Sequence, residues 1–320
     1  MTESSKRAWA TIDLSALQKN LSVVSARCPE SRIIPVIKAN AYGHGLEQVA
    51  KALVESPTDV SAFAVATMDE ALQLRNLGFN TAVMLLPGFG NKEEMELCFK
   101  QAIEPVVHSE QQLEQLGDYL DKKECKTKHK NPGRIWLKFN SGMNRLGLSA
   151  QGVISGYKLL YKHPATEVVL MSHLACADDL QDQSAIDFTQ QQLVHFDALR
   201  EQLIEIGAEP LDASLAASAG ILNLPASHYQ FVRPGILLYG GSAFLNRSSE
   251  ELGLLPVMTL STRLIAINEV KAGASIGYGA AYTCERDTRV GVLAIGYGDG
   301  YPRSAVNGTP VLFASSNLLA

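Results

Sequence analysis

The chain has 320 residues, of which 46% are hydrophobic and 19% are charged. This composition supplies enough apolar side chains for a large core and excludes an intrinsically disordered or low-complexity chain. A formal net charge of −5 excludes a general positive field that would hold nucleic acid or an anionic membrane, so we expect small molecules as partners. The length exceeds the size at which single cores stop growing, which predicts one large domain and a smaller one.

The cysteines and the N-terminal segment bear on the cellular compartment. Five cysteines are widely spaced and form no C-x-x-C pair: Cys28, Cys98, Cys125, Cys176 and Cys284. We therefore expect free thiols in a reducing compartment, with no disulfide framework and no metal site. Residues 1–20 lack the apolar core of a secretory signal, and no segment approaches the roughly 18 continuous apolar residues of a membrane span. The sequence predicts a soluble, cytoplasmic protein.

The first expected element is a helix. Leu14, Leu17, Leu21 and Val24 recur at helical spacing, and Asp13 stands where an N-cap residue is needed. This pattern predicts a helix that precedes the first strand.

Short apolar runs then alternate with helical patterns along most of the chain. Eight runs are rich in Val, Ile and Leu, at 32–38, 62–67, 82–87, 103–108, 134–140, 167–175, 210–218 and 229–240. The longest helical pattern between them covers 183–206. Apolar strands joined by helices indicate a parallel sheet buried on both faces. Eight such units within about 240 residues favour a closed (β/α)8 barrel, the TIM-barrel fold, over an open sheet.

The pattern changes after residue 241. Residues 256–270 alternate in polarity and 290–296 form a further apolar run, as is typical of antiparallel strands. The sequence thus predicts a barrel at 1–245 and a C-terminal β domain at 246–320. The last residues end in an uncharged tail, and we expect this β domain to be incomplete. The locally basic stretch 122–134 is expected to be a solvated surface loop.

In a (β/α)8 barrel the active site lies at the C-terminal ends of the strands. Five of the eight expected strands end in or near a polar group, namely Lys38, Arg145, His173, Ser218 and Arg233. A lysine at the end of a buried strand is either a Schiff-base nucleophile of lowered pKa or a side chain that extends to solvent. Spacing alone leaves both interpretations of Lys38 open, and it favours an ordinary core histidine at position 173.

The segment V-I-K-A-N-A-Y-G-H-G at 36–45 resembles the pyridoxal-phosphate attachment signature of the alanine racemases. Further blocks agree with that family in the same order, at 9–21, 138–147, 172–175, 232–240, 276–282 and 295–300. The resemblance extends from residue 9 to about residue 310. It implies an isomerase that interconverts L-alanine and D-alanine, with pyridoxal 5'-phosphate as cofactor and a D-alanine supply for the cell wall as its role.

The resemblance assigns cofactor-binding roles residue by residue. Lys38 would form the internal aldimine with the cofactor and serve as one of two catalytic bases. Tyr42, Ser218 and the backbone of Gly235 and Ile236 would hold the phosphate.

Two further residues would act around the cofactor ring. Arg233 would face the pyridine nitrogen; because the pKa of arginine exceeds about 12, it would keep that nitrogen unprotonated and weaken the cofactor as an electron sink. His173 would connect Arg233 to the second base.

Tyr278 would be this second base, contributed by the other subunit of a homodimer. A racemase needs two bases because the Cα proton must leave one face of a planar intermediate and return on the other.

The substrate side is implied in the same way. Arg145 would contact the cofactor's phenolic oxygen and the substrate carboxylate, with Met143 nearby. Lys138 aligns with a lysine that is carbamylated in some members of the family and then orients that arginine. Tyr297 would stand at the substrate entrance.

The sequence also departs from the family. Asn140 and Ser141 replace the usual Asp-Thr, and Ala217 stands where many members have Asn. The family carries a block of substrate-site residues beyond position 313 that residues 313–320 do not resemble, and we expect a truncation or frame change near residue 313. Two alternatives therefore stay open: a homologue that binds the cofactor but turns over poorly, and a racemase of broader specificity that includes serine.

Overall fold

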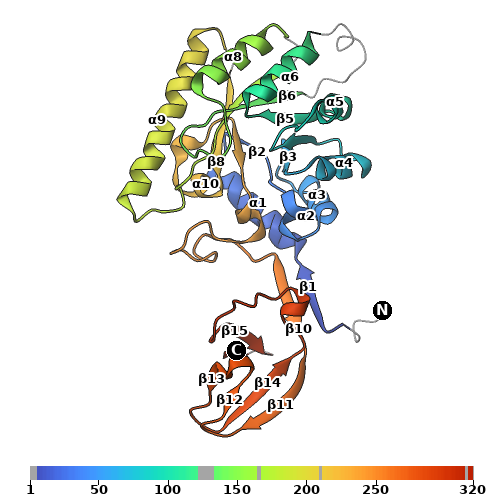
Figure 1. Ribbon diagram of the computed structural model, residues 1–320, viewed down its shortest axis with the longest axis vertical. Helices are drawn as coiled ribbons and strands as arrows, with labels where there is room; N and C mark the ends of the chain where they lie inside the picture. The colour runs from blue at the N-terminus through green and yellow to red at the C-terminus, as the bar shows by residue number, and fades with distance from the viewer. Residues whose placement is uncertain (1–5, 122–132, 164–166, 209–210, 314–315, 320) are drawn as a thin grey trace. The chain divides into compact units, whose positions relative to one another are not determined.

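A computed structural model describes residues 6–121, 133–163, 167–208, 211–313 and 316–319 (Figure 1). The chain divides into two compact units. One unit comprises residues 13–257, and the other combines residues 1–12 with residues 258–320.

The larger unit is built on an eight-stranded, all-parallel sheet with the order β2-β9-β8-β7-β6-β5-β4-β3. Its strands are β2 (Arg32–Ile33), β3 (Ala62–Val65), β4 (Ala82–Leu85), β5 (Ile103–Val107), β6 (Arg134–Lys138), β7 (Glu167–Met171), β8 (Asp212–Ala217) and β9 (Phe231–Arg233). Val36 pairs in parallel with Ala64 across the two edge strands, which closes the sheet. Each strand lies within one of the eight predicted runs, and the predicted (β/α)8 barrel is confirmed.

The helices of this unit alternate with its strands, and the longer ones lie outside the sheet (Figure 1). They are α1 (Leu14–Arg27), α2 (Lys38–Tyr42), α3 (Leu46–Val54), α4 (Met68–Asn76), α5 (Lys92–Gln101), α6 (Glu110–Leu120), α8 (Ala150–Tyr161), α9 (Gln183–Glu205) and α10 (Ser218–Asn223). Helix α1 begins where the sequence predicts, and the Asp13 carboxylate accepts the backbone N–H groups of Ser15 and Ala16. The long helix predicted over 183–206 is α9.

Two apolar layers hold the barrel together. The layer inside the sheet contains Ile34, Val36, Ala62, Ala64, Met84, Val106, Trp136, Val169, Met171 and Phe231, all at most 8% exposed. A second layer fills the space between the strands and helices α5, α6, α8 and α9 with leucine, phenylalanine and valine side chains. This double burial explains why the strands are apolar on both faces.

The smaller unit consists of antiparallel strand pairs, as its alternating pattern predicts. Strand β1 (Ala8–Ile12) pairs with β10 (Met258–Thr262), β11 (Leu264–Val270) with β14 (Thr288–Leu293), β12 (Ser275–Ile276) with β13 (Tyr282–Thr283), and β15 (Pro310–Phe313) with β16 (Ser316–Leu319).

The division between the units differs from the boundary at 245/246 that the sequence suggests. The N-terminal strand β1 was not expected; its pairing with β10 attaches residues 1–12 to the C-terminal unit. Residues 246–257 stay with the barrel because the Asn20 side chain of α1 bonds both the N–H and the C=O of Leu255, each at 2.8 Å. The Asp13 N–H also donates to the Val257 carbonyl at 2.8 Å. The contacts therefore divide the chain at 257/258.

Other expectations concern single segments. Cys28, Cys98, Cys176 and Cys284 are free thiols, and Cys125 falls outside the described residues. Residues 122–132 of the predicted basic loop also fall outside them. In the described part of the chain, no helix has the length and apolar character needed to cross a bilayer.

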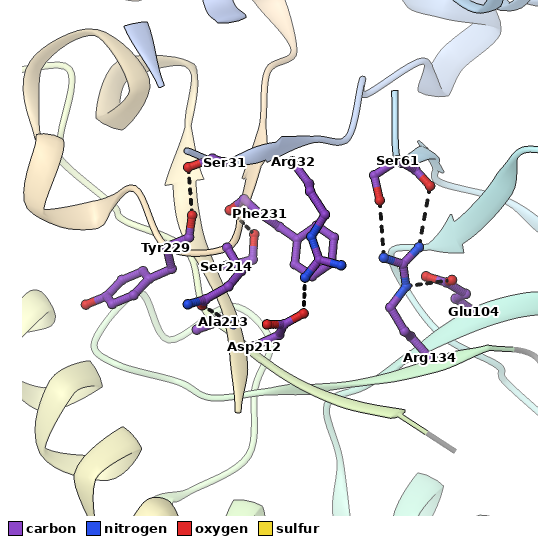
Figure 2. A network of polar contacts seen from close by, with 11 residues as sticks. Ser31, Arg32, Ser61, Glu104, Arg134, Asp212, Ala213, Ser214, Tyr229 and Phe231 are labelled. Carbon is purple, nitrogen blue, oxygen red and sulfur yellow. Dashed lines mark hydrogen bonds and ion pairs between the residues drawn. The ribbon is translucent and has the colours of Figure 1, made fainter. Parts of the chain in front are cut away.

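The N-terminal ends of the barrel strands carry ion pairs (Figure 2). Glu104, which is 2% exposed, accepts from Arg134 Nε at 2.8 Å and from Trp136 Nε1 at 2.9 Å. Burial raises the pKa of Glu104, and the charge of Arg134 opposes that rise. The Arg134 guanidinium also lies 4.9 Å from the centroid of the Phe231 ring. This network lies at the end of the barrel opposite the expected active site.

A second ion pair at the same end is more exposed. It joins the guanidinium of Arg32 to the carboxylate of Asp212, whose side chains are 49% and 21% exposed. The two pairs provide a matched comparison of buried and exposed charges.

We predict that Glu104→Leu lowers the free energy of unfolding by about 3–5 kcal/mol, because the Arg134 charge is left buried and unpaired. Asp212→Asn, at the more exposed pair, should cost at most about 1 kcal/mol. Urea unfolding measures both values. Equal losses in the two variants, or a double variant Glu104→Leu/Arg134→Leu that loses more than Glu104→Leu alone, would contradict this account of the barrel end.

Candidate active site

A cavity of about 550 Å³ lies at the C-terminal ends of the barrel strands. Its size is typical of a site for a cofactor or a small molecule. The residues that line it include every group that the sequence assigns to cofactor binding, namely Lys38, Tyr42, Arg145, His173, Ser218, Arg233, Gly235 and Ile236. Lys138 and Met143 also line it. The fold thus brings together residues that are up to 198 positions apart in the chain.

Lys38 begins an unusual left-handed turn. The φ angles of Ala39, Asn40, Ala41 and Tyr42 lie between 53° and 55°. A side chain with Cβ disfavours this conformation by about 1–2 kcal/mol per residue, so the turn is strained. Strain of this kind persists only where the surroundings enforce it, and it is concentrated at functional sites. The turn places Lys38 at its first position and Tyr42 at its last position against the same cavity.

The Tyr42 hydroxyl approaches the backbone that follows β9. A Cβ atom at Gly235 would lie 2.7 Å from Tyr42 Oη, so any larger residue at this position would displace the Tyr42 side chain. The Gly235 N–H donates to Ser218 Oγ at 3.0 Å. Burial raises the pKa of Tyr42, which keeps its hydroxyl protonated and able to donate. Tyr42 and Ser218 line the same cavity, and their two hydroxyls can donate hydrogen bonds to an anion bound there.

Arg233 is buried at the centre of the site. It is 3% exposed and donates from Nη2 to the carbonyls of Ser172 at 2.6 Å and Leu215 at 3.2 Å. It also donates from Nη1 to Ser214 Oγ. These acceptors are neutral, so they fix the side chain without cancelling its charge. Burial lowers the pKa of Arg233 to about 10, and the guanidinium therefore stays protonated at neutral pH.

Burial and the charge of Arg233 lower the pKa of two neighbouring side chains, Lys138 and His173. Burial, and then the charges of Arg233 and Arg145, lower the pKa of Lys138 to about 8. Burial, followed by the charge of Arg233 and of the other cations lining the cavity, lowers the pKa of His173 to about 3. The His173 ring is therefore neutral at neutral pH and offers one donor and one acceptor.

A buried polar network supports these residues, and sequence reasoning missed its central member. Gln192 on α9 is 1% exposed and donates to Ser141 Oγ and to the His173 carbonyl, both at 3.1 Å. Ser141 Oγ lies 2.8 Å from Ser172 Oγ. Ser141, which departs from the family's threonine, keeps the hydroxyl that this network uses. The one signal in the sequence was a glutamine beside the apolar stripe of α9.

Two predicted site residues lie elsewhere. Tyr278 and Tyr297 belong to the smaller unit, where they are 94% and 68% exposed. Neither is among the described residues that line the cavity. Their roles stay predictions.

Comparisons with known proteins identify the family of the chain. The sequence model of the alanine racemase N-terminal domain matches residues 12–243, and that of the C-terminal domain matches residues 257–318. The alanine racemase of Vibrio parahaemolyticus is 46% identical over 308 residues, which are 96% of this chain and 80% of the relative.

Solved structures give the same result. The biosynthetic alanine racemase of Pseudomonas aeruginosa superposes with a TM-score of 0.85 at 36% identity, over 98% of this chain and 82% of that one. The alanine racemase of Bartonella henselae, solved with covalently bound pyridoxal phosphate, has a TM-score of 0.81 at 28% identity over 98% and 82% of the two chains. Sequence, fold and domain order therefore agree that the chain belongs to the alanine racemase family of isomerases.

Proposed function

We propose that the chain interconverts L-alanine and D-alanine with pyridoxal 5'-phosphate bound at Lys38. The observation that carries the proposal is the single cavity on which Lys38, the hydroxyls of Tyr42 and Ser218, and the buried Arg233 converge. The Bartonella henselae relative, which carries this cofactor covalently, supports the choice of cofactor.

The groups present fit the cofactor chemically. Gly235 leaves room beside the Tyr42 hydroxyl that a Cβ atom would fill, and the hydroxyls with the backbone of Gly235 and Ile236 suit a phosphate. The protonated Arg233 suits a ring nitrogen that stays without a proton. When bound, the cofactor withdraws electrons from the Cα atom of the amino acid and makes its hydrogen acidic.

The residues of the chain would then move that proton. Lys38 acts on one face of the amino acid, where its amine takes the proton from Cα or returns it. Tyr278 of the partner subunit acts on the opposite face. Inversion requires one group to remove the proton from Cα while the other donates a proton to the opposite face. The two groups therefore exchange roles when the reaction runs from D-alanine to L-alanine instead of from L-alanine to D-alanine.

The other cavity residues would orient the substrate and adjust the second base. Arg145 binds the substrate carboxylate, and Tyr297 stands at the entrance. A neutral His173 can accept a hydrogen bond from the hydroxyl of Tyr278 of the partner subunit and so connect that base to the charge of Arg233. We further propose that the protein works in the cytoplasm as a homodimer and supplies D-alanine for the cell wall.

Lys38→Ala should abolish the yellow absorbance of the lysine-bound cofactor and lower racemisation of L-alanine at least about 100-fold, since it removes both the attachment point and one base. Lys51→Ala is a matched control, because the Lys51 side chain is 69% exposed and should change neither readout. Absorbance spectra and optical rotation measure the two effects. A Lys38→Ala protein that keeps the absorbance would refute the attachment site.

The same assay decides among the alternatives. Wild-type protein that binds the cofactor but leaves the rotation of L-alanine unchanged would indicate an impaired homologue. Racemisation of L-serine at a rate comparable to that of L-alanine would indicate broader specificity.

Tyr278→Phe should lower racemisation about 10²- to 10⁴-fold and leave cofactor binding intact, because it removes only the opposite base. Tyr282→Phe, at a neighbouring tyrosine that is 48% exposed, serves as the control. The subunit that supplies the base can be tested by mixing Lys38→Ala and Tyr278→Phe chains. If the tyrosine acts across subunits, hybrid dimers regain one intact site and activity returns; persistent inactivity of verified hybrids would show that it does not.

A further inference from the structure

Glu70 makes contacts that its place in the helix does not require. It is the third residue of α4, and its N–H donates to Thr67 Oγ1, the N-cap of that helix, at 3.2 Å. In a capping box the glutamate side chain would return to the N–H of the N-cap residue. Here Oε2 instead accepts the Ala66 N–H at 2.9 Å, and Oε1 accepts the Asn40 N–H at 3.1 Å. One carboxylate thus connects two strand–helix units of the barrel.

At one end of this connection is the left-handed turn. Asn40 is the second of the four left-handed residues that follow Lys38. Its other hydrogen bonds are local, since its side chain accepts the Leu46 N–H at 2.8 Å and its carbonyl accepts the Gly45 N–H at 3.0 Å. Glu70 therefore supplies a restraint from a separate part of the fold.

At the other end is the barrel wall. Ala66 directly follows β3 and lines the cavity. Strand β3 pairs with Val36, two residues before Lys38, through Ala64. The carboxylate thereby fixes the turn against the same strand that closes the barrel.

We propose that Glu70 is a positioning residue: its carboxylate enforces the strained left-handed turn and so directs Lys38 and Tyr42 into the cavity. If Glu70 only stabilised its helix, the hydrogen bond between its N–H and Thr67 would be sufficient. A positioning residue must hold Asn40 as well, and its loss should release the turn while the helix stays folded. The part of this inference that concerns cofactor affinity rests on the function proposed above.

The first test is Glu70→Gln, which leaves one acceptor oxygen for two N–H groups. In the cofactor-free protein, amide hydrogen exchange of residues 39–46 should become about tenfold faster, as expected for the loss of a hydrogen bond to a charged group. In the loaded protein, the dissociation constant for pyridoxal phosphate should rise by about the same factor. Glu70→Asp, whose shorter carboxylate reaches fewer of these groups, should give an intermediate effect.

Two neighbours serve as controls. Asp69→Asn changes an exposed acid in the same helical turn and should alter neither exchange nor cofactor affinity. Thr67→Ala removes the N-cap of α4 but keeps the Glu70 carboxylate, so it should lower the melting temperature without releasing residues 39–46. If Thr67→Ala releases the turn as much as Glu70→Gln does, Glu70 only stabilises the helix and the proposal is wrong.

A rescue experiment separates strain from general damage. Ala39 is exposed and has a φ of 53°, a conformation that glycine adopts without the Cβ penalty. Adding Ala39→Gly to Glu70→Gln should therefore restore part of the protection and part of the cofactor affinity. Unchanged exchange in Glu70→Gln, or no rescue by Ala39→Gly, would overturn the proposal. Failure of the wild-type protein to bind pyridoxal phosphate would refute the proposed function. It would not affect the test of Glu70, because hydrogen exchange is measured in the cofactor-free protein.

Discussion

Closure of the barrel beside Lys38 is the constraint on which the rest of the site depends. The backbone of residues 33–37 pairs with residues 61–64: Ser61 N–H donates to the Ile33 carbonyl at 2.8 Å, and Ala64 N–H donates to the Pro35 carbonyl at 2.9 Å. The Ile37 N–H donates to the Ala64 carbonyl at 2.9 Å. Lys38 is the next residue in the chain after Ile37. Its position is therefore fixed by the same hydrogen bonds that convert an open sheet into a barrel.

The two ends of the barrel use charge in opposite ways. At the N-terminal end, Arg134 is paired with Glu104 and its charge is balanced. At the C-terminal end, Arg233 has only neutral acceptors among its described hydrogen bonds, and burial together with its uncompensated charge lowers the pKa of Lys138 and His173. The Glu104–Arg134 pair leaves neither of its own charges free at its end of the barrel, whereas the unbalanced charge of Arg233 is available to a substrate or cofactor. This contrast agrees with a barrel whose chemistry is confined to one end.

The sequence predicted the barrel well because the strands lie in short apolar runs and the longer segments between them carry apolar residues at helical spacing. Because strand ends converge in any closed parallel barrel, it also predicted that Lys38, Arg145, His173, Ser218 and Arg233 lie together, whereas the family resemblance supplied Tyr42, Gly235 and Ile236. The left-handed turn was invisible, because residues 39–42 contain no glycine to indicate positive φ angles. Glu70 and Gln192 escaped notice for a related reason: their importance comes from backbone groups that only the folded chain brings near. Strand β1 was missed because its partner, β10, lies about 250 residues later.

Two lysines face the cavity, and they make the central claim open to a decisive measurement. The lowered pKa of Lys138 makes its amine a chemical rival to Lys38. The cofactor-loaded protein can be reduced with borohydride, digested and mapped by mass spectrometry. The account predicts that the pyridoxyl group is found on the peptide that contains Lys38. Its presence on Lys138, or on any other lysine, would contradict the account.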